Sequence, residues 1–398
     1  MNRRHDIDAL RALAFALVII YHVGMYYVAG WHWHLKSPHD AQWLQWPMRA
    51  LNLWRMDLVF LISGLALGFM RGGRSAVLRE RGRMLRERSK RLLLPLAFGM
   101  AVVVPFQPYA QGVANGLVAP GLGDFLLRYY AFSAWPAGAF DGWEARITWN
   151  HLWYLAYLWL YTAVLVLALP LLDSKWGQGL RQAFVGLRGA RLVLLPMLPL
   201  AVYALTLAPG FPPTRDLIHD WWLHAAYFTL FLYGWWMGVD AGLWNEMKRL
   251  RYRTLAASLA LMVAVLALVA TVPSGPARAF VRVVAQAYLW ITVVAVLGWA
   301  HASLNRPWPW LAWANESVYP WYVLHQTVII VLVVWLAPLA LGPVVEPVLL
   351  VAGTVCGCWA TTTLVQRARW LRPLFGLKPV PPRYPSPARQ VHPPVHSA

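Results

Sequence analysis

Long apolar runs, separated by shorter polar stretches, recur along the whole chain. Each run is close to the roughly 20 residues that a helix needs to cross a bilayer. The runs cover approximately residues 9–29, 56–71, 92–110, 149–172, 192–209, 221–240, 254–272, 282–304, 317–336 and 346–366. This pattern predicts an all-α fold, namely a polytopic membrane helix bundle of about ten transmembrane helices.

The same pattern predicts a simple domain organisation. We expect one transmembrane domain over residues 1–372 and a Pro-rich cytoplasmic tail over residues 373–398. The tail lacks the apolar residues that a packed core requires, so we expect it to be disordered. The first apolar run is too long for a signal peptide and has no small-residue cleavage site, so we interpret it as a retained helix.

Composition excludes an ordinary soluble domain. Of the 398 residues, 59% are hydrophobic and 13% are charged, whereas soluble domains are about 25% charged. The mean hydropathy is +0.48. The two cysteines, Cys356 and Cys358, lie in one apolar run, so we expect buried thiols and neither a disulfide framework nor a metal site.

The net charge of +19 points to membrane topology and not to nucleic acid. Basic residues hold cytoplasmic loops of membrane proteins in place, and most Lys and Arg residues lie at the two termini and in alternate connecting segments. This predicts cytoplasmic N- and C-termini. The densest basic group, 71–91, either fixes topology or forms an anion site for a phosphorylated donor, because Arg binds phosphate bidentately. Arg88 and Arg91 lie one turn apart within it.

The first helix carries polar residues that are costly at membrane depth and are therefore candidates for function. Arg11 and His22 are eleven residues apart, which at about 100° per residue places both side chains on one helix face, roughly 16 Å apart along the axis. Asp8 precedes Arg11 by three residues and can pair with it. With a cytoplasmic N-terminus, His22 lies beyond the membrane midplane. A neutral imidazole there can act as a general base or accept an acyl group itself.

Two polar residues of the second helix are further candidates. Asp57 begins that helix, where it either pairs with Arg55 at the membrane interface or orients His22. Ser63 is expected closer to the depth of His22 than Asp57 is.

Later candidates lie in two other predicted helices. His151, followed by Trp153, begins the fourth predicted helix, and His325 lies in the middle of the ninth, five residues after Pro320. Two long outer segments, 30–55 and 111–148, are rich in tryptophan. They are interpreted either as an aromatic belt at the membrane interface or as a platform on which sugar rings stack.

Together these residues resemble the bacterial acyltransferase 3 family of integral membrane proteins, in particular its glucan biosynthesis protein C succinyltransferases and related sugar O-acyltransferases. The matching motifs are Asp8-Ala-Leu-Arg11 followed by His22, Asp57-Leu-Val-Phe-Leu-Ile-Ser63-Gly64, Arg88-x-x-Arg91 before Leu-Pro95, His151-Leu-Trp-Tyr-Leu and Tyr319-x-x-Tyr322-x-x-His325. One departure is Leu58-Val59-Phe60, where the family commonly has paired phenylalanines.

The resemblance implies a multi-pass protein of the bacterial cell inner membrane that moves an acyl group from acyl-CoA to a hydroxyl of an envelope glycan or lipid-linked sugar. Acyl-CoA is then the donor substrate, with no bound cofactor; the other partners are the acceptor and membrane lipid, without nucleic acid. The resemblance also implies residue roles. His22 and Arg11 are the essential pair, and Arg88 and Arg91 bind the donor. To these we add, from their positions in the chain, a catalytic role for Asp57 and acceptor binding or support for Asp8, Ser63, His151, Trp153 and His325.

Several alternatives stay open at this point. The acyl group is acetyl or succinyl, which differ by a carboxylate that an arginine could bind. Transfer is either direct or through an acyl-histidine. Membrane-buried histidines and a Pro-broken helix also suit a proton-coupled transporter or flippase of an envelope precursor.

Overall fold

The computed structural model describes residues 4–71, 78–238, 240–272 and 275–379. In this part of the chain all regular secondary structure is helical, apart from an isolated bridge between Val28 and Ala41. The predicted all-α class is therefore confirmed. Residues 380–398, which make up most of the predicted tail, lie outside the described residues.

Most helices follow the apolar runs. The longer ones are α1 (His5–Tyr27), α3 (Arg55–Arg71), α4 (Leu78–Phe98), α7 (Trp153–Leu172), α11 (Trp221–Met237), α12 (Ala241–Thr271), α13 (Arg278–Ser303), α14 (Leu311–Leu336) and α15 (Gly342–Arg367). The shorter ones are α2 (Gln45–Asn52), α5 (Phe106–Ala114), α6 (Leu122–Tyr130), α8 (Lys175–Val185), α9 (Ala190–Leu194), α10 (Met197–Thr206) and α16 (Leu371–Leu374). Helices α4 and α12 begin well before the runs predicted at 92–110 and 254–272.

Among the described residues, 7 helices are long and apolar enough to cross a membrane, or up to 9 if each of two bent pairs is one span. The bent pairs are 81–103 with 106–114, at 41°, and 175–185 with 190–206, at 114°. The remaining predicted run, 221–240, is helix α11 of 17 residues. The count of ten and the side of the termini stay predictions.

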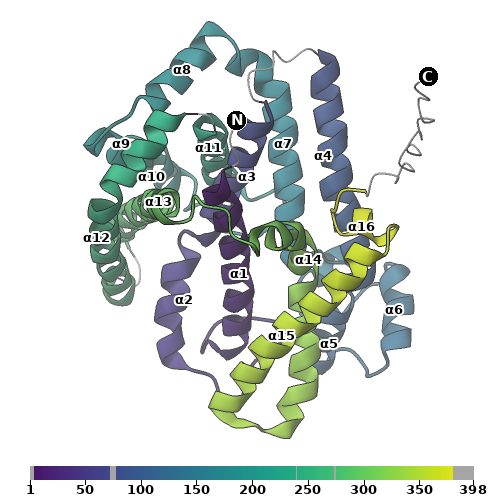
Figure 1. Ribbon diagram of the computed structural model, residues 1–398. Coiled ribbons are helices and arrows are strands. Elements are labelled where there is room, and N and C mark those ends of the chain that lie inside the picture. Colours follow the sequence, from purple (N-terminus) through teal and green to yellow (C-terminus); the bar gives the residue numbers. More distant parts are fainter. Residues whose placement is uncertain (1–3, 72–77, 239, 273–274, 380–398) are drawn as a thin grey trace, which may run out of the picture.

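The first outer segment is not a simple loop. Residues 45–52 form α2, which lies beside α1 (Figure 1) with the Met48 side chain against Gly24. Met48, Tyr21 and Val28 share one small apolar cluster. Because α2 leads the chain back along α1, α3 begins at the level of Tyr21 rather than beyond the end of α1.

The second outer segment has an apolar core of its own. Phe125 and Tyr129 of α6 cluster with Trp135 and Phe140, and all four side chains are buried. Trp33 of the first segment is buried too, whereas Trp43 is 69% exposed. These aromatic residues therefore divide between internal packing and the surface.

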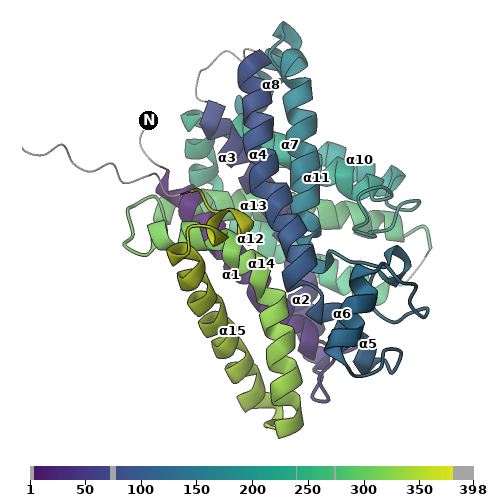
Figure 2. The same cartoon turned by 90° about the vertical axis from the view of Figure 1, so that its right-hand side faces the viewer.

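Helix α4 bends before it reaches α5. Pro95 lies inside α4, and the following residues Gly99–Val103 form a π-helical turn in which the Val104 N–H donates to the Gly99 carbonyl at 2.8 Å. The Thr327 hydroxyl of α14 donates to the Val103 carbonyl. A proline and a π-turn are ordinary causes of a kink. Beyond the kink, Gln107 of α5 donates to Thr327 of α14 and accepts from Asn150, just before α7. Figure 2 shows α5 and α6 at the opposite end of the molecule from α8.

Helices α3 and α11 cross at a very short distance. A Cβ atom on Gly64 would stand 1.9 Å from the Phe231 carbonyl oxygen, and one on Gly234 would stand 2.0 Å from the Leu61 carbonyl oxygen. Small residues at helix crossings let backbones approach closely in membranes. Beside this crossing, Phe60 is fully buried and stacks on Tyr227 with ring centroids 4.5 Å apart. The crossing fixes α3, which carries several candidate site residues.

Gly64→Ala is expected to destabilise the fold, because the new methyl group meets backbone atoms that cannot move independently. Overpacking of this kind costs about 1–3 kcal/mol, which should lower the thermal unfolding temperature in detergent. Gly179→Ala in α8, where a Cβ meets nothing within 4 Å, is the matched control and should be neutral or stabilising. Equal unfolding temperatures for Gly64→Ala and the parent chain would contradict this account.

Candidate active site

A cavity of about 380 Å³ opens between α1, α3, α4, α7 and α14. Its polar end holds the four arginines Arg4, Arg11, Arg88 and Arg91 together with Asp8, and Tyr319 lies beside them. Its other end is lined by mostly apolar side chains, which are Ala14, Phe15, Val59, Ile62, Ser63, Ala66, Tyr154 and Leu158. We call this space the basic cavity. It brings together the sequence-predicted residues Arg11, Asp8, Ser63, Arg88 and Arg91, which come from three helices.

Arg4 is a cavity residue that the sequence analysis missed. Its guanidinium donates to Asp6 at 2.7 and 2.9 Å and lies 4.2 Å from the ring centroid of Trp244. Asp6 is only 1% exposed and also contacts His301 Nδ1 at 2.7 Å. These contacts join the start of α1 to α12 and α13 and hold Arg4 in place. The sequence signal that could have indicated this role was Asp6, an acidic residue two positions later at the start of an apolar helix.

Arg88 and Arg91 enter the cavity from adjacent turns of α4. Arg91 Nε donates to the Gly376 carbonyl at 3.3 Å, and its guanidinium carbon lies 5.4 Å from the Tyr319 ring centroid. Gly376 has a φ of +72°, which favours glycine at this turn. Phe375 and Leu377 are buried against α4 and its neighbours. The first residues of the predicted tail therefore pack beside Arg91, although none of them lines the cavity.

Three aromatic rings close the apolar end of the cavity. Phe15 of α1, Tyr154 of α7 and Tyr322 of α14 are in mutual edge contact, with ring centroids 5.6 to 6.1 Å apart. We call them the aromatic layer. The Tyr154 hydroxyl lies 2.6 Å from Ser63 Oγ, which itself donates to the Val59 carbonyl, so the tyrosine is the donor. Ser63 thus lies in the basic cavity at the level of Phe15. The prediction that Ser63 lies close to the depth of His22 is wrong, because α3 begins deeper in the bundle than expected.

Beyond the aromatic layer, three histidines meet. The ring centroid of His325 lies 5.0 Å from that of His22 and 4.9 Å from that of His151. None of the three lines the basic cavity. We call them the histidine cluster. Residues from α1, from the turn before α7 and from α14 therefore converge, although they are far apart in the sequence.

Hydrogen bonds to backbone carbonyls orient the histidine cluster. His22 Nδ1 lies 2.8 Å from the Val18 carbonyl oxygen, and His325 Nδ1 lies 2.8 Å from that of Tyr322. Each Nδ1 must donate to a carbonyl, so Nε2 of each ring keeps its lone pair. His325 Nε2 is buried and has no hydrogen-bond partner among the described residues. His151 Nε2 donates to the Val323 carbonyl, and the Tyr322 hydroxyl donates to the His151 carbonyl.

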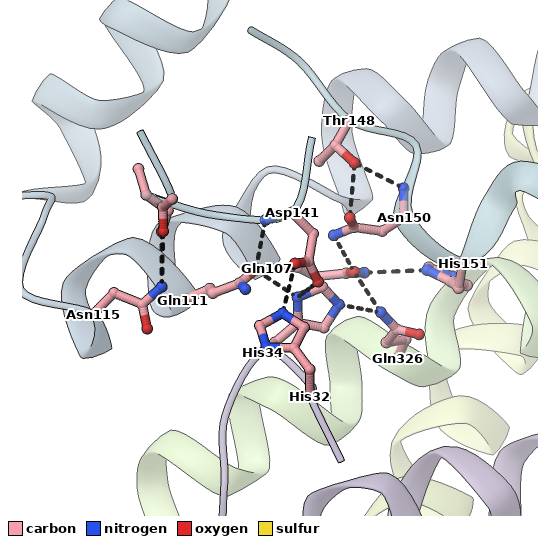
Figure 3. A network of polar contacts seen from close by, with 12 residues as sticks. His32, His34, Gln107, Gln111, Asn115, Asp141, Thr148, Asn150, His151 and Gln326 are labelled. Atoms are coloured by element: carbon pink, nitrogen blue, oxygen red, sulfur yellow. Dashed lines mark hydrogen bonds and ion pairs between the residues drawn. The ribbon is translucent and has the colours of Figure 1, made fainter. Parts of the chain in front are cut away.

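A polar network extends from His151 towards the outer segments (Figure 3). Gln107 of α5 contacts His151 Nδ1 at 3.4 Å and accepts from Gln326 at 3.0 Å. Gln326 Nε2 also lies 2.8 Å from His34 Nε2, and His34 Nδ1 contacts Gln111 at 2.8 Å and Asp141 at 3.4 Å. The kink of α4 is what brings Gln107 into this position.

The outer end of this network has perturbed pKa values. Burial lowers the pKa of His34, despite the opposing effect of Asp141. Burial alone would raise the pKa of Asp141. The charge of His34 and the hydrogen bond of His32 outweigh this effect, so the pKa of Asp141 lies below the usual range. At neutral pH the pair is thus a neutral imidazole beside a carboxylate.

Asp57 and Trp153 lie outside both the basic cavity and the histidine cluster. Asp57 is buried, forms no ion pair with Arg55 and lies within electrostatic range of Tyr227. Trp153 stacks on Tyr227 with centroids 6.1 Å apart. The structure therefore shows no contact through which Asp57 could orient His22, whose Nδ1 is held by Val18.

The geometry defines a site with two compartments. A cationic cavity, suited to phosphate groups, is separated by one layer of rings from His22 and His325, whose Nε2 atoms keep a lone pair. Such nitrogens can take up and return a proton. A family model described as an acyltransferase domain matches residues 4–363, nearly the whole chain.

This chain is a member of the acyltransferase 3 family. Among curated proteins and among solved structures, nothing matches it. Family membership and the long apolar helices together show that this acyltransferase is a multi-pass membrane protein.

Acid is expected to loosen the outer network of this acyltransferase. A group with a lowered folded pKa stabilises the fold above its unfolded pKa, and that stability is lost as the pH falls. This sign holds for Asp141 only below about pH 4 and for His34 below about pH 6.5, so His34 alone of the two acts between pH 7 and about pH 5. The Nε2 atom of His34 must release Gln326 to take up a proton. Amide exchange over residues 30–41 and 138–142, corrected for intrinsic rates, should accelerate between pH 7 and about pH 5. Asp141→Asn should steepen this pH dependence, because Asp141 opposes the lowering of the His34 pKa. Unchanged protection in the parent chain between pH 7 and about pH 5 would contradict the expectation.

Proposed function

We propose that this acyltransferase uses acyl-CoA as its donor and transfers the acyl group, acetyl or succinyl, to a hydroxyl of an envelope glycan or glycolipid at the bacterial inner membrane. The observation that carries the proposal is the arrangement of the basic cavity, the aromatic layer and the histidine cluster along α1. The excess of basic residues at the cavity end supports a cytoplasmic position for it.

The basic cavity suits a donor with several phosphates. Its volume lies within the range of about 300–1,000 Å³ that is usual for ligand sites, and its charged end is fixed by Asp6, His301 and Gly376. Arginine forks match phosphate oxygens bidentately. In this proposal Arg88, Arg91, Arg4 and Arg11 bind the phosphates of acyl-CoA, and the thioester arm follows the face of α1 towards Phe15.

The histidine cluster suits the transfer step. His22 Nε2 takes the proton of the acceptor hydroxyl as its oxygen attacks the thioester carbonyl, the carbon–sulfur bond breaks, and His22 returns the proton to the departing thiolate. His325 Nε2, which has no partner in the part of the chain that the structure describes, accepts a hydrogen bond from the same hydroxyl and orients it. The acyl group has to pass the aromatic layer, where Phe15 is the residue without a polar anchor.

His22→Ala should reduce acyl transfer by about 10²- to 10⁴-fold, which is the usual contribution of a general base. The measurement is incorporation of label from acyl-CoA into glycan or lipid, using membranes that contain equal amounts of full-length protein. His219→Ala is the control, because its ring is 71% exposed and pairs with Asp216 away from the cluster. Parent-level transfer by His22→Ala would contradict the proposal, and a transporter would give no labelled product at all.

Arg88→Gln should raise the KM for acyl-CoA about tenfold or more with little change in kcat, since a hydrogen bond to a charged group contributes about 1.5–3 kcal/mol. Arg86→Gln, two residues away on α4 and exposed to solvent, is the matched control and should leave KM unchanged. Steady-state kinetics in membranes measure both variants. The donor site would lie elsewhere if Arg88→Gln kept the parent KM or if both variants changed it equally.

A further inference from the structure

We propose that Arg55 binds a negatively charged group that one of the two substrates carries next to His22, an inference that rests on the proposed function. Arg55 begins α3 and is only 5% exposed. Its Nε and Nη1 atoms are buried without a hydrogen-bond partner among the described residues. Burial of a guanidinium is costly unless it is paired, so this cation requires an explanation.

Among the described residues no carboxylate forms an ion pair with Arg55, although Asp57 lies within its electrostatic range. Its guanidinium carbon stands 3.4 Å from the ring centroid of Tyr21, a cation–π contact that positions the group but leaves its charge uncompensated. Asp57, two residues later, forms no ion pair with it. Arg215 lies within electrostatic range and is also positive. The local field therefore favours an anion from outside the protein.

Arg55 lies at the transfer site and not at the donor phosphates. Tyr21 precedes His22 in α1, and the charge of Arg55 acts on both His22 and His325. The basic cavity lies on the other side of the aromatic layer and does not include Arg55. The phosphates bound by Arg88 and Arg91 are thus not its partner.

Two unmatched groups of opposite kind flank His22. His325 Nε2 is an acceptor without a donor, and Arg55 offers donors without an acceptor. A substrate that completes both brings a hydroxyl to His325 and an anion to Arg55. Because a guanidinium fork matches carboxylate and phosphate, the anion is either a carboxylate at the far end of the acyl group or an acidic group on the acceptor. A neutral acyl group moving to a neutral sugar would leave Arg55 unpaired.

The test varies charge on each substrate separately. Membranes with full-length protein are given acetyl-CoA or succinyl-CoA, each with a neutral oligosaccharide or its phosphorylated form, and kcat/KM is measured for the four pairs. We expect the parent chain to prefer a charged donor or a charged acceptor by at least about tenfold, which corresponds to about 1.4 kcal/mol. Arg55→Gln should lose this preference while it keeps the uncharged pair within about threefold.

Controls separate this role from others. Arg49→Gln changes another outer arginine that stacks on an aromatic ring, Trp31, and should keep the preference. Arg55→Lys, which retains the charge, should keep part of it. Measurable transfer without any charge preference in the parent chain would overturn the role of Arg55 without touching the proposed function, even if Arg55→Gln did not fold. An equal loss of kcat for all four pairs in Arg55→Gln would overturn it too, because that result indicates an oxyanion or structural role. Absence of transfer from every acyl-CoA would instead contradict the proposed function.

Discussion

Every polar group inside an apolar bundle must find a partner, and this constraint decides how the helices of this protein meet. Asp6 ties the start of α1 to α13 through His301. Gln107 and Gln326 tie α5 to α14. These bonds come from segments far apart in the chain, so each one fixes a helix position that apolar packing alone would leave adjustable. The site lies where such ties are densest.

The sequence was sufficient to predict the class of fold and the shared helix face of the polar residues in α1. Hydrophobic periodicity located every long helix, and helical spacing predicted that Arg11 and His22 share a face. In the structure Arg11 lines the basic cavity and His22 lies further along α1, with Phe15 between them. Helical geometry is a local property, so one sequence is enough to derive it.

Other features depended on contacts that no local pattern encodes. The depth of α3 follows from α2, a helix of 8 residues inside an expected loop, and it reversed the expected levels of Ser63 and Asp57 relative to His22. Arg4 was missed because its partners lie in α12 and α13. Arg55 entered the sequence analysis only as one of two alternatives for Asp57, as its ion-pair partner, and the structure shows no ion pair between the two side chains although they lie within electrostatic range.

The aromatic layer has a consequence for the membrane as well as for transfer. On one side lies a charged cavity, and on the other a polar network reaches the outer segments, so three rings separate the two polar regions. The Tyr154 and Tyr322 hydroxyls are both engaged, with Ser63 and with the His151 carbonyl, and Phe15 has no polar atom to offer. A chain of water molecules finds no continuous partners there. The layer thus interrupts the polar path between the basic cavity and the histidine cluster, which is a barrier to proton movement through the protein.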